Sequence, residues 1–101
     1  MKKTFPLAAE GKHPERLLEA TKHEIRKYFR RERRRALPTG VDFWDFDCRF
    51  GATPETAELV VEAELMQRID AVKQAGASQF YVEILAKPGH RAPRPSENIP
   101  G

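Results

Sequence analysis

Apolar residues recur along this chain with two different spacings, and these spacings predict where its helices and strands lie. Between residues 14 and 36, apolar side chains return every three or four positions, which is typical of a helix with one buried stripe. The stripe contains Leu18, Thr21, Ile25, Phe29 and Ala36, widened by Leu17 and Tyr28. Pro14 suits the first position of a helix, and residues 37–40 (LPTG) end one. We therefore predict a first helix from residue 14 to residue 35 or 36.

A second helix is predicted from the residues that follow Gly51. Thr53 is a suitable N-cap, Pro54 suits the first helical position, and Gly76 is a natural C-terminal stop. Between them, an apolar stripe with helical spacing is formed by Ala57, Val61, Leu65, Ile69 and Val72. This pattern predicts a helix from residue 54 to about residue 75.

Strict alternation of apolar and polar residues predicts strands at residues 41–50 and 79–87. In the first, one face holds Trp44, Phe46, Cys48 and Phe50, and the other holds Phe43, Asp45, Asp47 and Arg49. In the second, one face holds Phe80, Val82, Ile84 and Ala86, and the other holds Tyr81, Glu83, Leu85 and Lys87. Residues 4–7 predict a shorter strand, and Pro6 places it at an edge because proline cannot donate to a ladder.

The predicted order of elements is β-α-β-α-β, in a single α/β domain formed by residues 1–87. Right-handed crossovers would place two long helices on one face of a three-stranded sheet, giving a two-layer sandwich. If the first strand pairs in the antiparallel direction, the class becomes α+β. Residues 88–101 contain four prolines and predict a flexible tail.

Composition narrows the class of protein further. The chain has 101 residues, of which 40% are hydrophobic and 33% charged, as in one soluble globular domain. No apolar run approaches the ~20 residues that cross a bilayer, so we expect no membrane association. The single cysteine, Cys48, cannot form an internal disulfide, which fits a reducing compartment. We therefore expect a cytoplasmic protein.

Charge is distributed unevenly between the two halves of the chain. Residues 1–40 contain 12 Lys or Arg and 5 acidic residues, whereas residues 41–87 contain 4 Lys or Arg and 9 acidic residues. The basic half predicts either attraction to an external polyanion or internal balance against the acidic half.

The strongest basic signal lies within the predicted first helix. Its seven cations are Arg26, Lys27, Arg30, Arg31, Arg33, Arg34 and Arg35. A helix so charged can neutralise several phosphates of RNA or DNA. The alternative is a solvated helix end whose cations pair with Glu58, Glu62 and Glu64 of the second helix.

Five segments of the chain together resemble a family of short bacterial proteins known only as a domain of unknown function. They are residues 2–7 (KKTFPL), 11–14 (GKHP), 31–38 (RERRRALP), 40–51 (GVDFWDFDCRFG) and 79–91 (QFYVEILAKPGHR). The resemblance implies a bacterial, intracellular protein. It implies no activity, ligand or catalytic residue.

Two further groups of residues are candidate sites. Asp45 and Asp47 lie on one face of their strand, and Glu83 could approach them from the strand at residues 79–87, as a divalent-ion site would need. The favoured interpretation is that Arg49 and Lys87 neutralise the two aspartates across this face. If the strands are parallel, loops at their carboxyl edge would form an anion-binding rim with two helix N-termini. The residues of that rim are Lys12, His13, Arg49, Thr53, His90 and Arg91.

These observations lead to a small non-catalytic binding protein as the principal hypothesis. It contacts a polyanion, RNA over DNA, through the first helix. A protein-interaction module is the alternative, in which the basic helix meets an acidic partner or the acidic half of a second copy. We expect the protein to be a monomer or a weak homodimer. A third hypothesis is an anion or phosphometabolite site at the carboxyl-edge rim. No cofactor, metal or catalytic residue is predicted, since the sequence has no nucleophile–base arrangement and no metal-ligand spacing.

Overall fold

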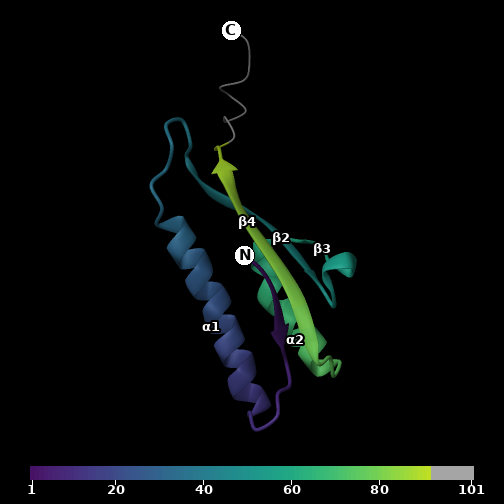
Figure 1. The fold of residues 1–101 in the computed structure, drawn as a ribbon. Helices are drawn as coiled ribbons and strands as arrows, with labels where there is room; N and C mark the ends of the chain where they lie inside the picture. The colour runs from purple at the N-terminus through teal and green to yellow at the C-terminus, as the bar shows by residue number, and fades with distance from the viewer. Residues whose placement is uncertain (92–101) are drawn as a thin grey trace.

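Residues 1–91, which the computed structural model describes, form a sheet with two helices packed on it (Figure 1). The main elements are β1 (Lys2–Pro6), α1 (Pro14–Arg33), β2 (Phe43–Gly51), β3 (Glu58–Val60), α2 (Leu65–Gln74) and β4 (Gln79–Gly89). Two single 3₁₀ turns, η1 (Pro54–Thr56) and η2 (Glu62–Glu64), flank β3. Most of the predicted tail, residues 92–101, lies outside the described residues.

The described sheet has four strands in the order β1-β4-β2-β3, and every neighbouring pair is antiparallel. The chain therefore runs β-α-β-β-α-β, with β4 inserted between β1 and β2, and β2 inserted between β3 and β4. The prediction of three strands in a β-α-β-α-β order was wrong. The prediction of a mixed two-layer structure with two helices against a sheet is confirmed.

The error lies in the predicted helix at residues 54–75, of which α2 is only the second half. Residues 57–61 (AELVV) contain two β-branched valines, which suit a strand better than a helix. The edge of β2 offers unpaired backbone groups, and β3 pairs with it from Cys48↔Val60 to Phe50↔Glu58. Gly51 permits this hairpin, because a Cβ there would lie 2.7 Å from Cα of Ala57.

The other elements follow the sequence pattern closely. Helix α1 begins at the predicted Pro14 and ends at Arg33, two or three residues early. Strand β1 lies at an edge of the sheet, as its Pro6 predicted. Strand β4 continues to Gly89, so residues 88 and 89 belong to the sheet and not to a tail. They do so because Trp44 and Phe43 of β2 extend the ladder opposite them.

One hydrophobic core lies between the sheet and the two helices. Ile25 and Phe29 of α1 and Leu65 and Ile69 of α2 pack onto the inner face of the sheet. The buried strand residues are Phe5, Phe46, Cys48, Phe50, Phe80, Val82 and Ile84. Cys48 is 1% exposed, on the strand face that it shares with Phe46 and Phe50, and this burial raises the pKa of its thiol to about 11. The core thereby orients α1 and determines which of its side chains face outward.

Candidate polyanion-binding surface

The seven predicted cations lie along the C-terminal half of α1 and the two residues that follow it, and all seven are exposed. We call this set, residues 26, 27, 30, 31 and 33–35, the cationic face. Arg33 and Arg35 lie over aromatic rings beside the core, and the other five project from the sides of α1 that the buried Ile25 and Phe29 leave free. The helix is therefore both a core element and a carrier of positive charge.

Two members of the cationic face form ion pairs within the described residues. The Arg33 guanidinium pairs with Glu62 of η2, and Arg35 Nη1 lies 2.8 Å from Glu32 Oε2. Among residues 1–91 the other five, namely Arg26, Lys27, Arg30, Arg31 and Arg34, have no ion-pair partner. Of the three glutamates proposed as internal partners, only Glu62 pairs with α1 in this part of the chain. In the described residues, a single ion pair on the cationic face, Arg33–Glu62, therefore joins the basic half of the chain to the acidic half.

Aromatic rings support several of the guanidiniums. Arg31 lies over the ring of Tyr28, with 5.5 Å between the guanidinium carbon and the ring centroid, and Arg35 lies 4.9 Å from the Trp44 ring. The guanidinium carbon of Arg33 lies 5.5 Å from the ring centroid of Phe29 and 5.2 Å from that of Phe46. Such contacts hold a guanidinium plane in place without neutralising it.

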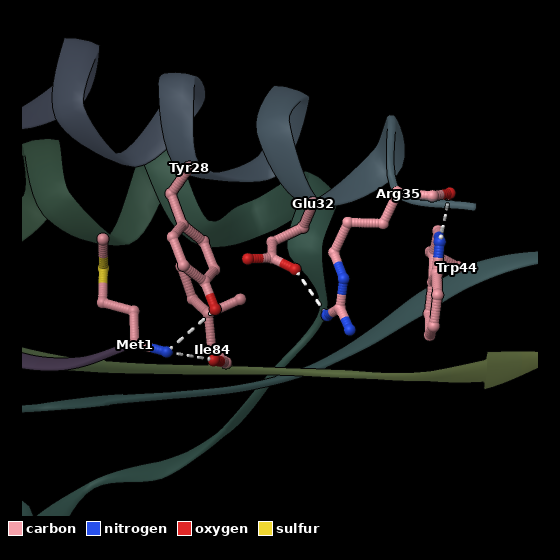
Figure 2. Close-up of polar contacts among 6 residues, drawn as sticks. All are labelled: Met1, Tyr28, Glu32, Arg35, Trp44 and Ile84. Atoms are coloured by element: carbon pink, nitrogen blue, oxygen red, sulfur yellow. Dashed lines mark hydrogen bonds and ion pairs between the residues drawn. The ribbon is translucent and has the colours of Figure 1, made fainter. Parts of the chain in front are cut away.

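Hydrogen bonds attach α1 to the sheet at two points (Figure 2). The Met1 ammonium donates to Tyr28 Oη at 3.0 Å and to the Ile84 carbonyl at 2.7 Å, and Trp44 Nε1 donates to the Arg35 carbonyl at 3.0 Å. Burial lowers the pKa of the Met1 ammonium, while nearby Glu32 acts in the opposite direction. The cationic face is thus presented from a helix fixed near both β4 and β2.

A groove of about 480 Å³ separates the cationic face from α2. We call it the helix groove, and its lining residues are Arg26, Phe29, Arg30, Arg33, Arg34, Glu62, Leu65 and Met66. Its walls carry four arginines from α1 and its C-cap, and its apolar lining comes from both helices. Glu62 is its single carboxylate. The groove therefore combines excess positive charge with an apolar floor.

The opposite face of the sheet is covered by no helix in the described residues, and we call it the open sheet face. Lys87 Nζ lies 2.7 Å from Asp47 Oδ1 and 3.8 Å from Asp45 Oδ2, and the hydrogen bond to Asp47 raises the pKa of Lys87. Arg49 is registered opposite Glu83 on β4. Of the two cations predicted to neutralise the aspartates, Lys87 does so, whereas Arg49 forms no ion pair with either among residues 1–91. Within residues 1–91, no cluster of three His, Cys, Asp or Glu residues could hold a metal ion.

The predicted anion-binding rim does not come together in the structure. Because β4 runs antiparallel to β1 and β2, its end with His90 and Arg91 lies at the opposite end of the sheet from Gly51. That separation is roughly 30 Å at about 3.4 Å per strand residue. The Arg91 amide instead donates to Asp42 Oδ2 at 2.8 Å.

The remaining rim residues have local roles. His13 is the N-cap of α1, and its Nδ1 accepts the Glu15 amide at 3.3 Å. Thr53 caps η1 through a reciprocal capping box with Thr56. Lys12 and His13 line a groove of about 520 Å³ at the start of α1, and none of the other four rim residues lines it.

Sequence reasoning identified all seven cations but missed the helix groove. The spacing of Arg26, Arg30 and Arg34 places three of them on one helical stripe, which was the available signal. Leu65 and Met66 could not be connected with these arginines, because the sequence does not show where the second helix lies relative to the first. Only the packing of α2 beside α1 brings these residues to the arginines.

A comparison with known proteins identifies the family and no relative of known activity. No curated protein and no solved structure matches the chain. Within residues 1–91, neither helix is long and apolar enough to cross a bilayer. The family model described as "Family of unknown function (DUF6172)" matches residues 1–95, as the resemblance in the sequence indicated. The chain therefore belongs to this family of unknown function.

Proposed function

We propose that this chain is a non-catalytic binding protein that holds a polyanion, RNA in preference to DNA, on the cationic face of α1. One observation carries the proposal. Five exposed cations gather on one helix segment with no ion-pair partner among residues 1–91. Clustered like charges repel one another and destabilise the compact state, and a polyanion removes that repulsion when it binds.

The chemistry of the side chains favours phosphate as the bound group. Six of the seven cations are arginines, whose planar forks match two oxygens of a phosphate at once. Each neutralised phosphate also releases condensed counterions, so that binding falls steeply as salt rises. RNA is favoured over DNA because its single-stranded regions leave bases free for arginine planes and apolar surface.

A direct binding measurement tests this proposal. Labelled mixed-sequence RNA and DNA of equal length are titrated with the protein, and fluorescence anisotropy is recorded at low and at physiological salt. We expect binding to RNA at low salt and a linear fall of log K with log salt. Absence of binding to either nucleic acid at low salt would refute the proposal.

A second candidate function, self-association, is favoured by a different surface. The open sheet face exposes apolar side chains, with exposed fractions of 40% for Phe43, 43% for Leu85 and 69% for Leu59. The same face carries three cations and three anions, so a second copy could match it in charge. Those residues are Lys2, Arg49, Lys87, Asp45, Asp47 and Glu83.

Sedimentation tests this second function without reference to nucleic acid. We expect a concentration-dependent monomer–dimer equilibrium that Leu85→Lys weakens, because a charged ammonium in the apolar part of this face would lose its hydration when a second copy covers it. A purely monomeric protein at high concentration would remove self-association and leave the RNA proposal unaffected. An acidic protein partner is a separate alternative, to which α1 would bind.

A further inference from the structure

The helix groove differs from the rest of the cationic face because it joins arginines to an apolar floor. We propose that this groove receives an unpaired nucleotide, so that the ligand class of this protein is single-stranded RNA and not duplex. This inference rests on the proposed function and names its ligand more narrowly. It is carried by three observations: which cations line the groove, what forms the floor, and how large the space is.

The cations of the groove are arginines only. Arg26, Arg30 and Arg34 line it without an ion-pair partner among the described residues, whereas Lys27 belongs to another side of α1. They recur at every fourth position over about 12 Å of helix. A guanidinium can bind phosphate through its edge and stack on a base through its plane, and a lysine ammonium offers only a point charge.

The floor gives a nucleotide base an apolar surface to rest on. Its accessible part is Met66, which is partly exposed, and beneath it lie Phe29 and Leu65, which are buried in the core. Bases of a duplex are stacked and paired, so a duplex could reach the arginines with its phosphates but would leave the exposed part of Met66 in water. A single strand can turn a base inward and cover it.

The size of the groove fits a ligand of this kind. Its volume of about 480 Å³ lies within the ~300–1,000 Å³ typical of small-molecule sites, which suits one nucleotide and its flanking phosphates. Arg33 forms one wall, held by Glu62 and by contacts with Phe29 and Phe46. The two ring contacts hold this guanidinium in place, which reduces the entropic cost of binding.

A matched pair of substitutions on one helix tests the inference. Arg30→Gln removes a groove arginine, and Lys27→Gln removes the same charge outside the groove; both residues are exposed, and circular dichroism verifies the fold. Affinity is measured for a labelled single-stranded RNA and for the same RNA annealed to its complement. A third variant, Met66→Ser, makes the floor polar without changing charge.

We expect the single strand to bind more tightly than the duplex, by about fivefold or more, which is the lower bound for one stacked base. Arg30→Gln should reduce single-strand affinity several times more than Lys27→Gln, and Met66→Ser should reduce the preference for single strands. Equal affinity for both RNAs, with equal effects of the two charge variants, would overturn the groove assignment while the proposed function stands.

Two further outcomes separate the inference from its competitors. Binding to neither RNA at low salt would refute the proposed function itself, and the inference with it. An acidic peptide with apolar residues that binds more tightly than RNA, and loses affinity on Arg30→Gln, would assign the groove to a protein partner instead and overturn the inference.

Discussion

On the open sheet face Lys87 pairs with both Asp45 and Asp47. In the helix groove the single carboxylate, Glu62, pairs with Arg33, so the other three arginines of the groove have no ion-pair partner among residues 1–91. Both surfaces are rich in charge. They differ in whether the chain supplies the counter-charge from a neighbouring element.

The difference arises from how each surface is built. On the sheet, cross-strand neighbours stand about 5 Å apart, so alternating charges on β2 and β4 meet one another. On α1, residues four apart carry the same sign, and α2 brings apolar residues toward them. Charges that are paired within the chain need no ligand to balance them. Charges without such a partner gain the most from an oppositely charged ligand. The following predictions test this contrast, from the largest expected effect to the smallest.

The first prediction concerns two phenylalanines, one from each surface. Phe29→Ala should lower the free energy of unfolding by about 3–5 kcal/mol, because it removes a buried ring from the core and from the groove floor. Phe43→Ala on the open sheet face should cost about 1 kcal/mol, since that ring is 40% exposed. Urea denaturation measures the free energy of unfolding of both variants. Similar losses in the two would contradict the view that α1 packs into the core while Phe43 lies on an exposed surface.

The second prediction neutralises equal charge on the two surfaces. Changing Arg26, Arg30 and Arg34 together to Gln should reduce the slope of log K against log salt by about 2 for single-stranded RNA, at about 0.7 per phosphate contact. The matched control changes Lys2, Arg49 and Lys87 to Gln and should leave that slope nearly unchanged. Equal effects would mean that overall charge, and not the groove, governs binding.

The third prediction concerns the carboxylate within the groove. Glu62→Gln should raise RNA affinity by about two- to fivefold, because it frees Arg33 and removes one repelling charge, within the ~1 kcal/mol typical of an exposed ion pair. Glu58→Gln changes the net charge equally but lies on β3 and does not line the groove. Binding isotherms at one salt concentration distinguish the two. Equal gains from both variants would show that Glu62 has no local role.

The smallest effect at neutral pH is expected from the core layer between the two surfaces, because its one titratable thiol is then protonated in both the folded and the unfolded chain. The pKa of Cys48 is about 11 in the folded chain and 9.0 in its ordinary state, so only the unfolded chain ionises between these values. The contribution of Cys48 to stability should be complete below pH 9 and lost as the pH rises toward 11. Denaturation at several pH values, compared with Cys48→Ala, checks this. A pH slope that the substitution leaves unchanged would show that other groups cause it.

Much of the fold could be predicted from short-range patterns. The stripe through Ile25 and Phe29 identified α1, and strict alternation assigned both faces of β2 and β4 correctly. Residues 57–61 were wrongly assigned to a helix, because periodicity alone does not distinguish a short apolar run in a strand from one in a helix. Its conformation depends on the free edge of β2, which comes from a different part of the chain.

The candidate site, like the fold, could be predicted from the sequence only in part. The positions of the seven cations follow from the sequence, and so does their exclusion from the apolar stripe. Their counter-charges follow only in part, because the sequence offered Glu58, Glu62 and Glu64 alike as partners. Only the tertiary structure selects Glu62, which lies 29 residues from Arg33. Of the rim residues, His13 and Thr53 showed their capping role in sequence, but the distance between them and His90 depended on strand direction.

The sequence by itself determined a basic helix with a buried stripe, two alternating strands and an edge strand, since these depend on neighbours within a few residues. The tertiary structure decided the antiparallel order, the fourth strand and the pairing of charges. It also decided that α2 lies beside the cationic face, which creates the helix groove. These features depend on contacts between distant segments, whose free energy is gained only when the whole core packs together.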